Sequence, residues 1–359
     1  MPAAQTILVF LGVLSVLVLA HELGHFVVAK RAGIKVQEFG FGYPPRLLGI
    51  KVGETVYSLN LLPLGGFVRM LGETGNKGDM GALDDQHVPG SFASKSKRVR
   101  AAVLAAGSAM NLLLVPVLFS IGLMIGEPVP CEGCNRVEIY GVQAGSPAAE
   151  AGLQGGDVFV SLNGQPIDDL EDVRTIVRAG GPEQPVTAVV LRDGETLTRT
   201  LTPRMGAAGA ENQPTIGIQL GPEVVTVSYP IWQAIPMGIQ RTGDLIRVFF
   251  TGLGQMLSRE TPAELAGPVG IAQMTGQAAR AGWVYLLQFT AFLSLNLAVF
   301  NMLPIPGLDG ARLLFVIVEG LRGRRVNPQT EGVIHFIGLM LLLTLMAYVS
   351  VNDVQRLVG

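Results

Sequence analysis

ILVFLGVLSVLVLAHELGHFVVAK, residues 7–30, is the stretch that decides the fold. It holds no charged residue from Ile7 to Ala20, and after His21-Glu22-Leu23-Gly24-His25 its apolar character continues to Ala29. A helix needs ~20 mostly apolar residues to cross a hydrocarbon core, so the stretch predicts a transmembrane helix over Ile7–Ala29. The alternative is a cleaved signal peptide, but no Lys or Arg precedes the run and it continues past His21.

Three further stretches are apolar enough to span a bilayer, at Ala101–Ile125, Val284–Leu303 and Val333–Ser350. Apolar residues make up 49% of the 359 residues and charged residues only 15%, too few for the surface of a soluble protein of this length. The predicted fold class is a polytopic α-helical membrane protein with four transmembrane helices. No run of Lys and Arg is long enough to suggest a nucleic-acid partner. The predicted partners are the lipid bilayer and membrane proteins.

Lys and Arg near the span ends predict the orientation, because cytoplasmic loops carry an excess of both. The segment from Lys30 to Arg100 is rich in them, and the connection before the last span holds Arg312, Arg322, Arg324 and Arg325. Both connections are therefore expected in the cytoplasm. We expect the protein to lie in the inner (plasma) membrane. The chain ends and the long segment between the second and third spans are expected on its extracytoplasmic side.

His21-Glu22-Leu23-Gly24-His25 has the pattern H-E-x-x-H within an apolar helix. Residues four apart share a helix face, so His21 and His25 can reach one zinc ion while Glu22 activates the attacking water as general base. The alternative is a polar helix end at the membrane interface. It is disfavoured because ionisable groups at membrane depth cost on the order of several kcal/mol without a function.

A catalytic zinc ion needs a third protein ligand. The strongest candidate is Asp309 in NMLPIPGLDG, residues 301–310, where a carboxylate follows an apolar span and a broken helix. Irregular backbone at membrane depth is tolerated where protein or a water cavity covers it. The alternative for Asp309 is a turn at the cytoplasmic interface, and the other histidines are His87 and His335.

The chain resembles the site-2 protease family of intramembrane zinc metalloproteases, in the bacterial branch similar to the regulator-of-sigma-E protease. The resemblance rests on the motifs His21–His25, Leu64-Gly65-Gly66-Phe67-Val68, Gly267-Pro268-Val269-Gly270-Ile271, and Asn296 with Asn301–Gly310. It implies Asp309 as the third zinc ligand. It also implies a substrate-binding or oxyanion role for Asn296, Asn301, Gly65 and Gly66, with interhelical hydrogen bonding as the alternative for Asn296.

The second span departs from the family pattern. Ala106-Gly107-Ser108-Ala109-Met110-Asn111 resembles a G-P-x-x-N stretch, but Ser108 stands in place of Pro. No catalytic residue depends on that position. Asn111 is expected to be a packing residue or a polar group near the site.

Two accessory regions complete the prediction. Short strands punctuated by Tyr43-Pro44-Pro45 and Leu62–Gly66 predict a small membrane-associated β-element over Val36–Met70. In the resembling family such an element offers its edge to an unwound substrate, and the alternative is a lid without substrate contact.

Glu138–Pro203 looks like one extracytoplasmic PDZ domain, with Asn163-Gly164 at a turn.

Two smaller features flank that domain. Ile231–Leu257 mixes apolar residues with charges in helical spacing, which predicts an amphipathic helix at the outer face. Cys131 and Cys134 are the only cysteines, and a local disulfide is favoured over free thiols or redox catalysis.

The predicted organisation in chain order is the first transmembrane helix with the zinc motif (1–30), a cytoplasmic loop with the β-element (31–100), the second transmembrane helix (101–126), a linker with C-x-x-C (127–137), the PDZ domain (138–205), a linker and amphipathic helix (206–282), the third transmembrane helix with the LDG motif (283–310), a cytoplasmic connection (311–332) and the fourth transmembrane helix (333–359).

Together these features predict a zinc-dependent intramembrane endoprotease. Its expected substrates are single-pass membrane proteins, such as anti-sigma factors or remnant signal peptides. The alternative is a membrane scaffold or metal transporter that recruits partners through the PDZ domain. Transport would require more intramembrane ligands than His21, His25 and Asp309, and it would leave Glu22 without a purpose.

Overall fold

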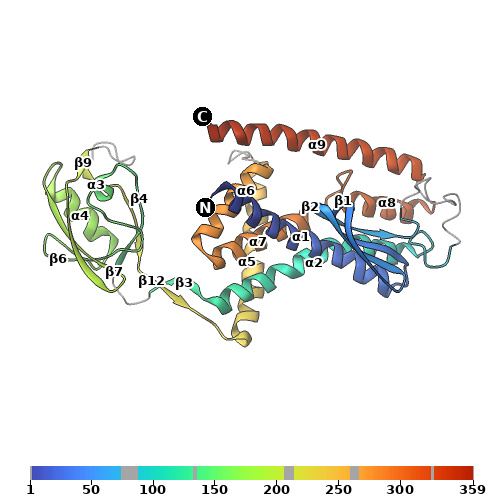
Figure 1. The fold of residues 1–359 in the computed structure, drawn as a ribbon, viewed down its shortest axis with the longest axis horizontal. Coiled ribbons are helices and arrows are strands. Elements are labelled where there is room, and N and C mark those ends of the chain that lie inside the picture. Colours follow the sequence, from blue (N-terminus) through green and yellow to red (C-terminus); the bar gives the residue numbers. More distant parts are fainter. Residues whose placement is uncertain are drawn as a thin grey trace. The chain divides into compact units, whose positions relative to one another are not determined.

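The computed structural model describes residues 2–73, 88–131, 136–205, 214–258, 267–324 and 327–358. The chain forms two compact units (Figure 1). The first unit combines Met1–Ile125 with Tyr229–Gly359, and the second is Gly126–Ser228.

The first unit is helical and confirms a polytopic membrane protein. Its helices are α1 (Ala3–Arg31), α2 (Lys97–Ile125), α5 (Ile231–Leu257), α6 (Pro268–Ala281), α7 (Trp283–Met302), α8 (Asp309–Arg322) and α9 (Pro328–Val358). Among the described residues, α1, α2, α7 and the Gln329–Asp353 part of α9 are long and apolar enough to cross a membrane. The four expected spans are therefore present: the first, second and fourth lie within longer helices, and the third ends at Met302, one residue before the predicted Leu303.

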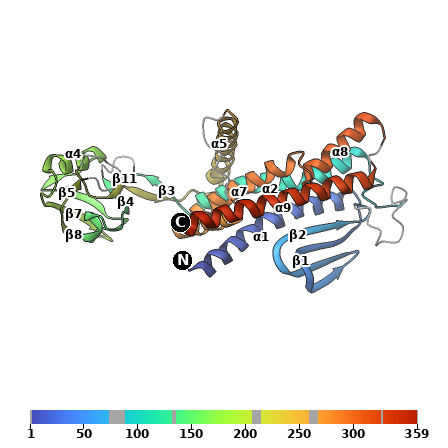
Figure 2. The same ribbon diagram turned by 90° about the horizontal axis from the view of Figure 1, so that it is seen from above.

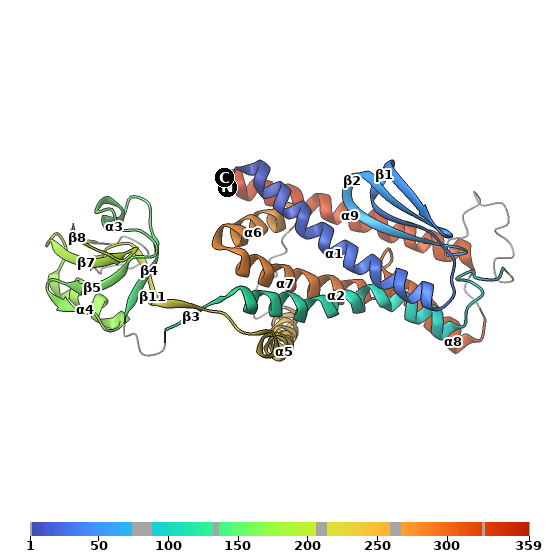
Figure 3. The same cartoon turned by 60° about the horizontal axis from the view of Figure 1, so that its bottom comes forward.

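Helices α1, α2 and α7 run side by side, with α2 packed against both of the others (Figures 2 and 3). Small residues allow the close approach of α1 and α2, because a Cβ at Gly24 would lie 2.2 Å from the carbonyl oxygen of Ala106. Val115 of α2 packs with Ala291 and Leu295 of α7, and all three are buried. This three-helix contact positions the polar residues discussed below.

Helix α5 has the bounds that the sequence predicts for the amphipathic helix. It packs against α2 but crosses the direction of the spans, since Figure 2 shows it nearly end-on while α2 and α7 lie lengthwise. The crossing suits a helix that lies along a membrane surface. Its location at the outer face stays a prediction.

The β-element consists of β1 (Val36–Val52) and β2 (Thr55–Met70), which pair antiparallel. The first part of β1 pairs with two separate parts of β2, so that Phe41 lies opposite both Leu59 and Gly66. Residues 66–70 thus pair with the first part of β1, and β2 packs against α1 (Figure 3). The element therefore reaches the helix that carries the H-E-x-x-H motif.

The second unit is β-rich. Its main sheet has the strand order β11-β4-β5-β7-β8, with β6 paired to β5. The elements are β3 (Glu127–Pro130), β4 (Val137–Val142), α3 (Pro147–Glu150), β5 (Val158–Leu162), β6 (Gln165–Pro166), α4 (Leu170–Gly180), β7 (Val186–Arg192), β8 (Glu195–Leu201), β9 (Arg204–Met205), β10 (Pro214–Thr215), β11 (Ile218–Pro222) and β12 (Val224–Val227). The predicted turn joins β5 to β6, where Asn163 and Gly164 both have positive φ.

The unit extends beyond the 138–205 range expected for the PDZ domain. Strand β11 adds to the sheet beside β4, and β12 pairs with β3 in the segment expected to be a linker. These strands have only four or five residues each, too short for a clear periodic pattern. Cys131, just after β3, is disulfide-bonded, while Cys134 and the start of the linker predicted from residue 206 lie outside the described residues.

One buried ion pair fastens the sheet of this unit. Asp157 is fully buried, and its carboxylate accepts hydrogen bonds from Arg192 Nε at 2.6 Å and Nη2 at 2.8 Å. The N–H of Gln154 donates to it as well, at 2.9 Å. Burial opposes ionisation, yet these hydrogen bonds hold the pKa of the Asp157 carboxyl below its ordinary value.

We predict that Asp157→Asn loosens this unit in the full-length protein. Hydrogen exchange of the β4, β5 and β7 amides at pH 7 should become about 3-fold faster or more, because the charged partner of Arg192 is lost. Since the folded pKa is depressed, the stabilisation is present above an unfolded carboxyl pKa of about 4 and declines as the pH falls through the lower folded value. Asp168→Asn, at an exposed position, should change nothing. Equal exchange in the two variants would contradict the prediction.

Candidate metal centre

Three side chains from distant parts of the chain converge on one point. His21 and His25 lie one turn apart on α1, and Asp309 is the first residue of α8. His21 Nε2 lies 2.9 Å and His25 Nε2 3.1 Å from Asp309 Oδ2, and the two Nε2 atoms are 3.2 Å apart. Among the described residues, this is the group of His, Cys, Asp and Glu side chains arranged to hold a metal ion.

The spacing of these atoms fits zinc. Ligand atoms about 2.0–2.1 Å from a tetrahedral zinc ion are separated by about 3.3 Å. The observed separations of 2.9–3.2 Å are close to that value and require only a small expansion. Two imidazoles and one carboxylate also form a ligand set typical of catalytic zinc, with a fourth position left open.

Helix α2 covers the other side of the two histidines with residues spaced four apart. The carbonyl oxygen of Val103 lies 2.8 Å from His25 Nδ1, and Asn111 Nδ2 lies 3.4 Å from His21 Nδ1. Between them, a Cβ on Gly107 would meet His25 Nε2 at 2.4 Å and His21 Nε2 at 2.7 Å. Gly107 therefore leaves the space in which both imidazoles stand.

Asp309 is brought to the histidines by the break between α7 and α8. Helix α7 ends at Met302, because Leu303 precedes Pro304 and takes an extended conformation. The chain then turns back tightly, since a Cβ on Gly310 would lie 2.2 Å from the carbonyl oxygen of Leu303. This confirms the broken helix that the sequence predicts around the LDG motif.

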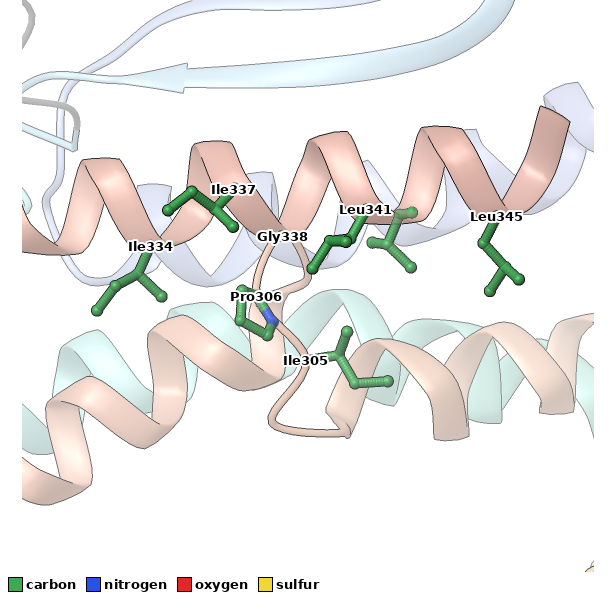
Figure 4. A pocket seen from close by; sticks show the side chains of 8 residues that line it. Ile305, Pro306, Ile334, Ile337, Gly338, Leu341 and Leu345 are labelled. Carbon is green, nitrogen blue, oxygen red and sulfur yellow. The ribbon is translucent and has the colours of Figure 1, made fainter. Parts of the chain in front are cut away.

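Helix α9 covers the loop that carries Asp309. The N–H of Gly307 donates to His335 Nδ1 at 3.1 Å, and a Cβ on Gly338 would lie 2.3 Å from that of Pro306. Ile305 and Pro306 of the loop and five side chains of α9 line an apolar pocket of about 270 Å³ (Figure 4). His335, the alternative third ligand, thus contacts the backbone of the loop and does not join the ligand cluster.

Ion pairs fix the helix that begins with Asp309. Glu319 of α8 and Arg100 of α2 are both buried and form a salt bridge. Arg312, one turn after Asp309, pairs with Glu73 at 2.6 Å, just after β2. The Arg100–Glu319 pair thus joins α8 to α2, and removal of either side chain would leave the other charge buried and unpaired, at a cost of ~3–5 kcal/mol.

Glu22 stands between the ligand cluster and the β-element. It lies within electrostatic reach of His21, His25 and Asp309. A Cβ on Gly66 would lie 3.1 Å from Glu22 Cγ, so β2 passes directly against this side chain. The strand that pairs with β1 at Phe41 therefore borders the candidate base.

Among the remaining candidates from the sequence, Asn296 and Asn301 lie on α7 and Gly65 lies on β2. Asn296 Nδ2 donates to the carbonyl of Phe292 in its own helix at 2.8 Å, and Asn301 lies near the end of α7. Gly65 is buried where a Cβ would meet the ring of Tyr43 at 2.7 Å. His87 lies outside the described residues. A substrate role for Asn296, Asn301 and Gly65 stays a prediction.

Two groups that contact the histidines were not predicted from the sequence. The Val103 carbonyl carries no side-chain signal, so the sequence could not reveal it. Gly107 belongs to the stretch that resembles the family pattern in the second span, and its spacing of four residues from Asn111 was a usable signal.

Comparisons with known proteins find relatives over nearly the whole chain. The profile of Peptidase family M50 matches residues 9–345. A putative zinc metalloprotease of Clostridium perfringens is 37% identical over 344 residues, 95% of this chain and 96% of its own length. The Regulator of sigma-W protease RasP of Bacillus subtilis is 34% identical over 427 residues, 98% of this chain and 99% of its own length.

Some solved structures match about a quarter of the chain. The PDZ domain of an SdrC-like protein from Listeria monocytogenes covers 25% of this chain and 92% of its own, with 18% identity and a TM-score of 0.23. The sequence matches, by contrast, run through nearly the whole chain. This chain belongs to the site-2 protease family of membrane metalloproteases, peptidase family M50.

Proposed function

We propose that this protein is a zinc-dependent intramembrane endopeptidase in which His21, His25 and Asp309 hold the metal and Glu22 is the general base. The observation that carries the proposal is the convergence of the three ligand atoms between helices apolar enough to span a bilayer. Such groups are costly at membrane depth, so their gathering there calls for a function. Relatives named zinc metalloproteases support zinc as the ion.

Zinc bound to these residues would lower the pKa of a water molecule and polarise the carbonyl of the scissile peptide bond. The protein supplies the rest. Glu22, beside the ligands, is placed to take a proton from the attacking water and to pass it to the leaving amine. The Val103 carbonyl orients His25, and the ion pairs of α8 hold Asp309 in place.

The substrate must reach this centre in an extended form, because helical carbonyls are hydrogen-bonded and shielded. The strand containing Gly65 and Gly66 borders Glu22 and offers a backbone to which an unwound segment could pair. Asn296 and Asn301 are proposed to hold the substrate or the oxyanion, as in the family. Substrates with helix-breaking residues near the cytoplasmic end of their span should be favoured.

The proposed substrates are single-pass membrane proteins, such as anti-sigma factors or remnant signal peptides. A relative named as a regulator of sigma-W supports the first class. We place the protein in the inner (plasma) membrane with the PDZ-like unit outside the cytoplasm. The Lys and Arg of the 30–100 segment support that orientation.

The direct test of this function is Glu22→Gln. We expect normal zinc content with cleavage of a tagged single-pass substrate slowed about 10²- to 10⁴-fold, because the base is lost while the three ligands stay. Zinc is measured by mass spectrometry and cleavage in proteoliposomes. Glu54→Gln, the same change at an exposed position, should cleave normally. Near-normal cleavage by zinc-loaded Glu22→Gln would disprove the assigned role.

Asp309→Ala tests the third ligand. Removal of a ligand should weaken zinc binding at least about 100-fold, beyond the 10- to 100-fold typical of residues that only orient a ligand. Competition with a chromogenic chelator measures the affinity. Asp244→Ala changes an exposed carboxylate of α5 and serves as the control. Unaltered zinc affinity in Asp309→Ala would remove this residue from the metal site.

Gly107→Ala tests the space that α2 leaves for the histidines. The added methyl group would collide with both imidazoles, so zinc affinity should fall about 10-fold or more. Gly122→Ala is the matched control on the same helix, because its Cβ would have ordinary contacts of 3.8 Å or more. Equal zinc affinity in the two variants would mean that the imidazoles do not stand where the structure places them.

A further inference from the structure

We propose that Asn111 is a positioning residue for His21. In the zinc-loaded protein its side-chain oxygen accepts a hydrogen bond from Nδ1–H of His21, which fixes the ring in the tautomer that presents Nε2 to the metal. The inference rests on the proposed function, because it takes His21 as a zinc ligand.

The contact lies on the face of His21 that points away from the other ligands. His21 Nε2 faces His25 and Asp309, while Nδ1 faces the side-chain amide of Asn111, whose nitrogen lies 3.4 Å away. Asn111 is fully buried. In the part of the chain that the structure describes, its Oδ1 is a buried oxygen without a hydrogen-bond partner.

An unpaired buried oxygen is costly, by about 1–3 kcal/mol, so its presence beside a metal ligand needs an explanation. A neutral imidazole that binds metal through Nε2 carries its proton on Nδ1. That proton requires an acceptor. Rotation of the Asn111 amide by 180° exchanges its oxygen and nitrogen, and then satisfies both the Nδ1–H and the orphan oxygen.

His25 provides an internal comparison. Its Nδ1 lies 2.8 Å from the Val103 carbonyl, an atom that can only accept a hydrogen bond. His25 is therefore locked with its Nε2 free for a metal. His21 faces an amide that can donate or accept, so its orientation toward zinc depends on which end of Asn111 it meets.

The main chain at Asn111 is held independently of this amide. Ser294 of α7 is buried, and its hydroxyl donates to the Asn111 carbonyl oxygen at 2.8 Å. Val103, Gly107 and Asn111 share one stripe of α2, which fixes the position of the side chain relative to both histidines. A change of the amide thus removes the hydrogen bond to His21 while the contact between α2 and α7 stays.

The test compares Asn111→Leu with Asn111→Asp in the full-length protein. Leu has a similar volume without an acceptor, whereas Asp keeps an acceptor oxygen in either protonation state. Zinc affinity is measured by chelator competition and site geometry by the visible absorption spectrum of the Co²⁺-substituted protein. We expect Asn111→Leu to bind zinc about 10- to 100-fold more weakly with an altered Co²⁺ spectrum, and Asn111→Asp to remain within about 3-fold of wild type.

Ser294→Ala, which affects only the hydrogen bond to the Asn111 main chain, should bind zinc like wild type. Wild-type affinity in folded Asn111→Leu would overturn the inference, and so would an equal loss in the Leu and Asp variants. If Asn111→Leu does not fold, Asn111→Ala replaces it in the same comparison. Failure of the proposed function would give a different result from failure of this inference. In that case the wild-type protein would bind no zinc, or His21→Ala would bind zinc as tightly as wild type.

Discussion

The close approach of α1 and α2 is the constraint on which the site depends. Glycine at position 24 allows the helices to touch at Ala106, and glycine at position 107 leaves room for two imidazoles between them. A bulkier residue at either point would separate the helices or displace the two imidazoles. Because lipid provides no hydrophobic drive between helices, small residues of this kind are what makes tight packing in a membrane favourable.

A second requirement follows from the low polarity of the surroundings. Asp309 enters the site through an irregular loop, and backbone at membrane depth must be covered by protein. Helix α9 provides that cover with His335, which accepts from Gly307, and with Gly338, which admits Pro306. Helix α9 therefore supports the loop that leads to Asp309, the proposed third ligand.

The accessory elements divide between the two units. The β-element packs on α1 and brings Gly66 against Glu22, so a backbone strand and the candidate base share one location. The β-rich unit has a separate core, with Val137, Phe159 and Val190 almost fully buried and the Asp157–Arg192 pair fastening its sheet.

The sequence by itself determined the spans, the spacing of His21 and His25, and the carboxylate of the LDG motif, because helix periodicity and hydropathy are local properties. It also predicted α5 and the Asn163-Gly164 turn from local signals. Only the tertiary structure decided that Val103 orients His25, that Asn111 faces His21 and that His335 contacts the loop before Asp309. Strands β11 and β12 likewise became visible only through their partners. These contacts join residues 28 to 100 positions apart, and local patterns carry no information about which distant helix face or strand will meet them.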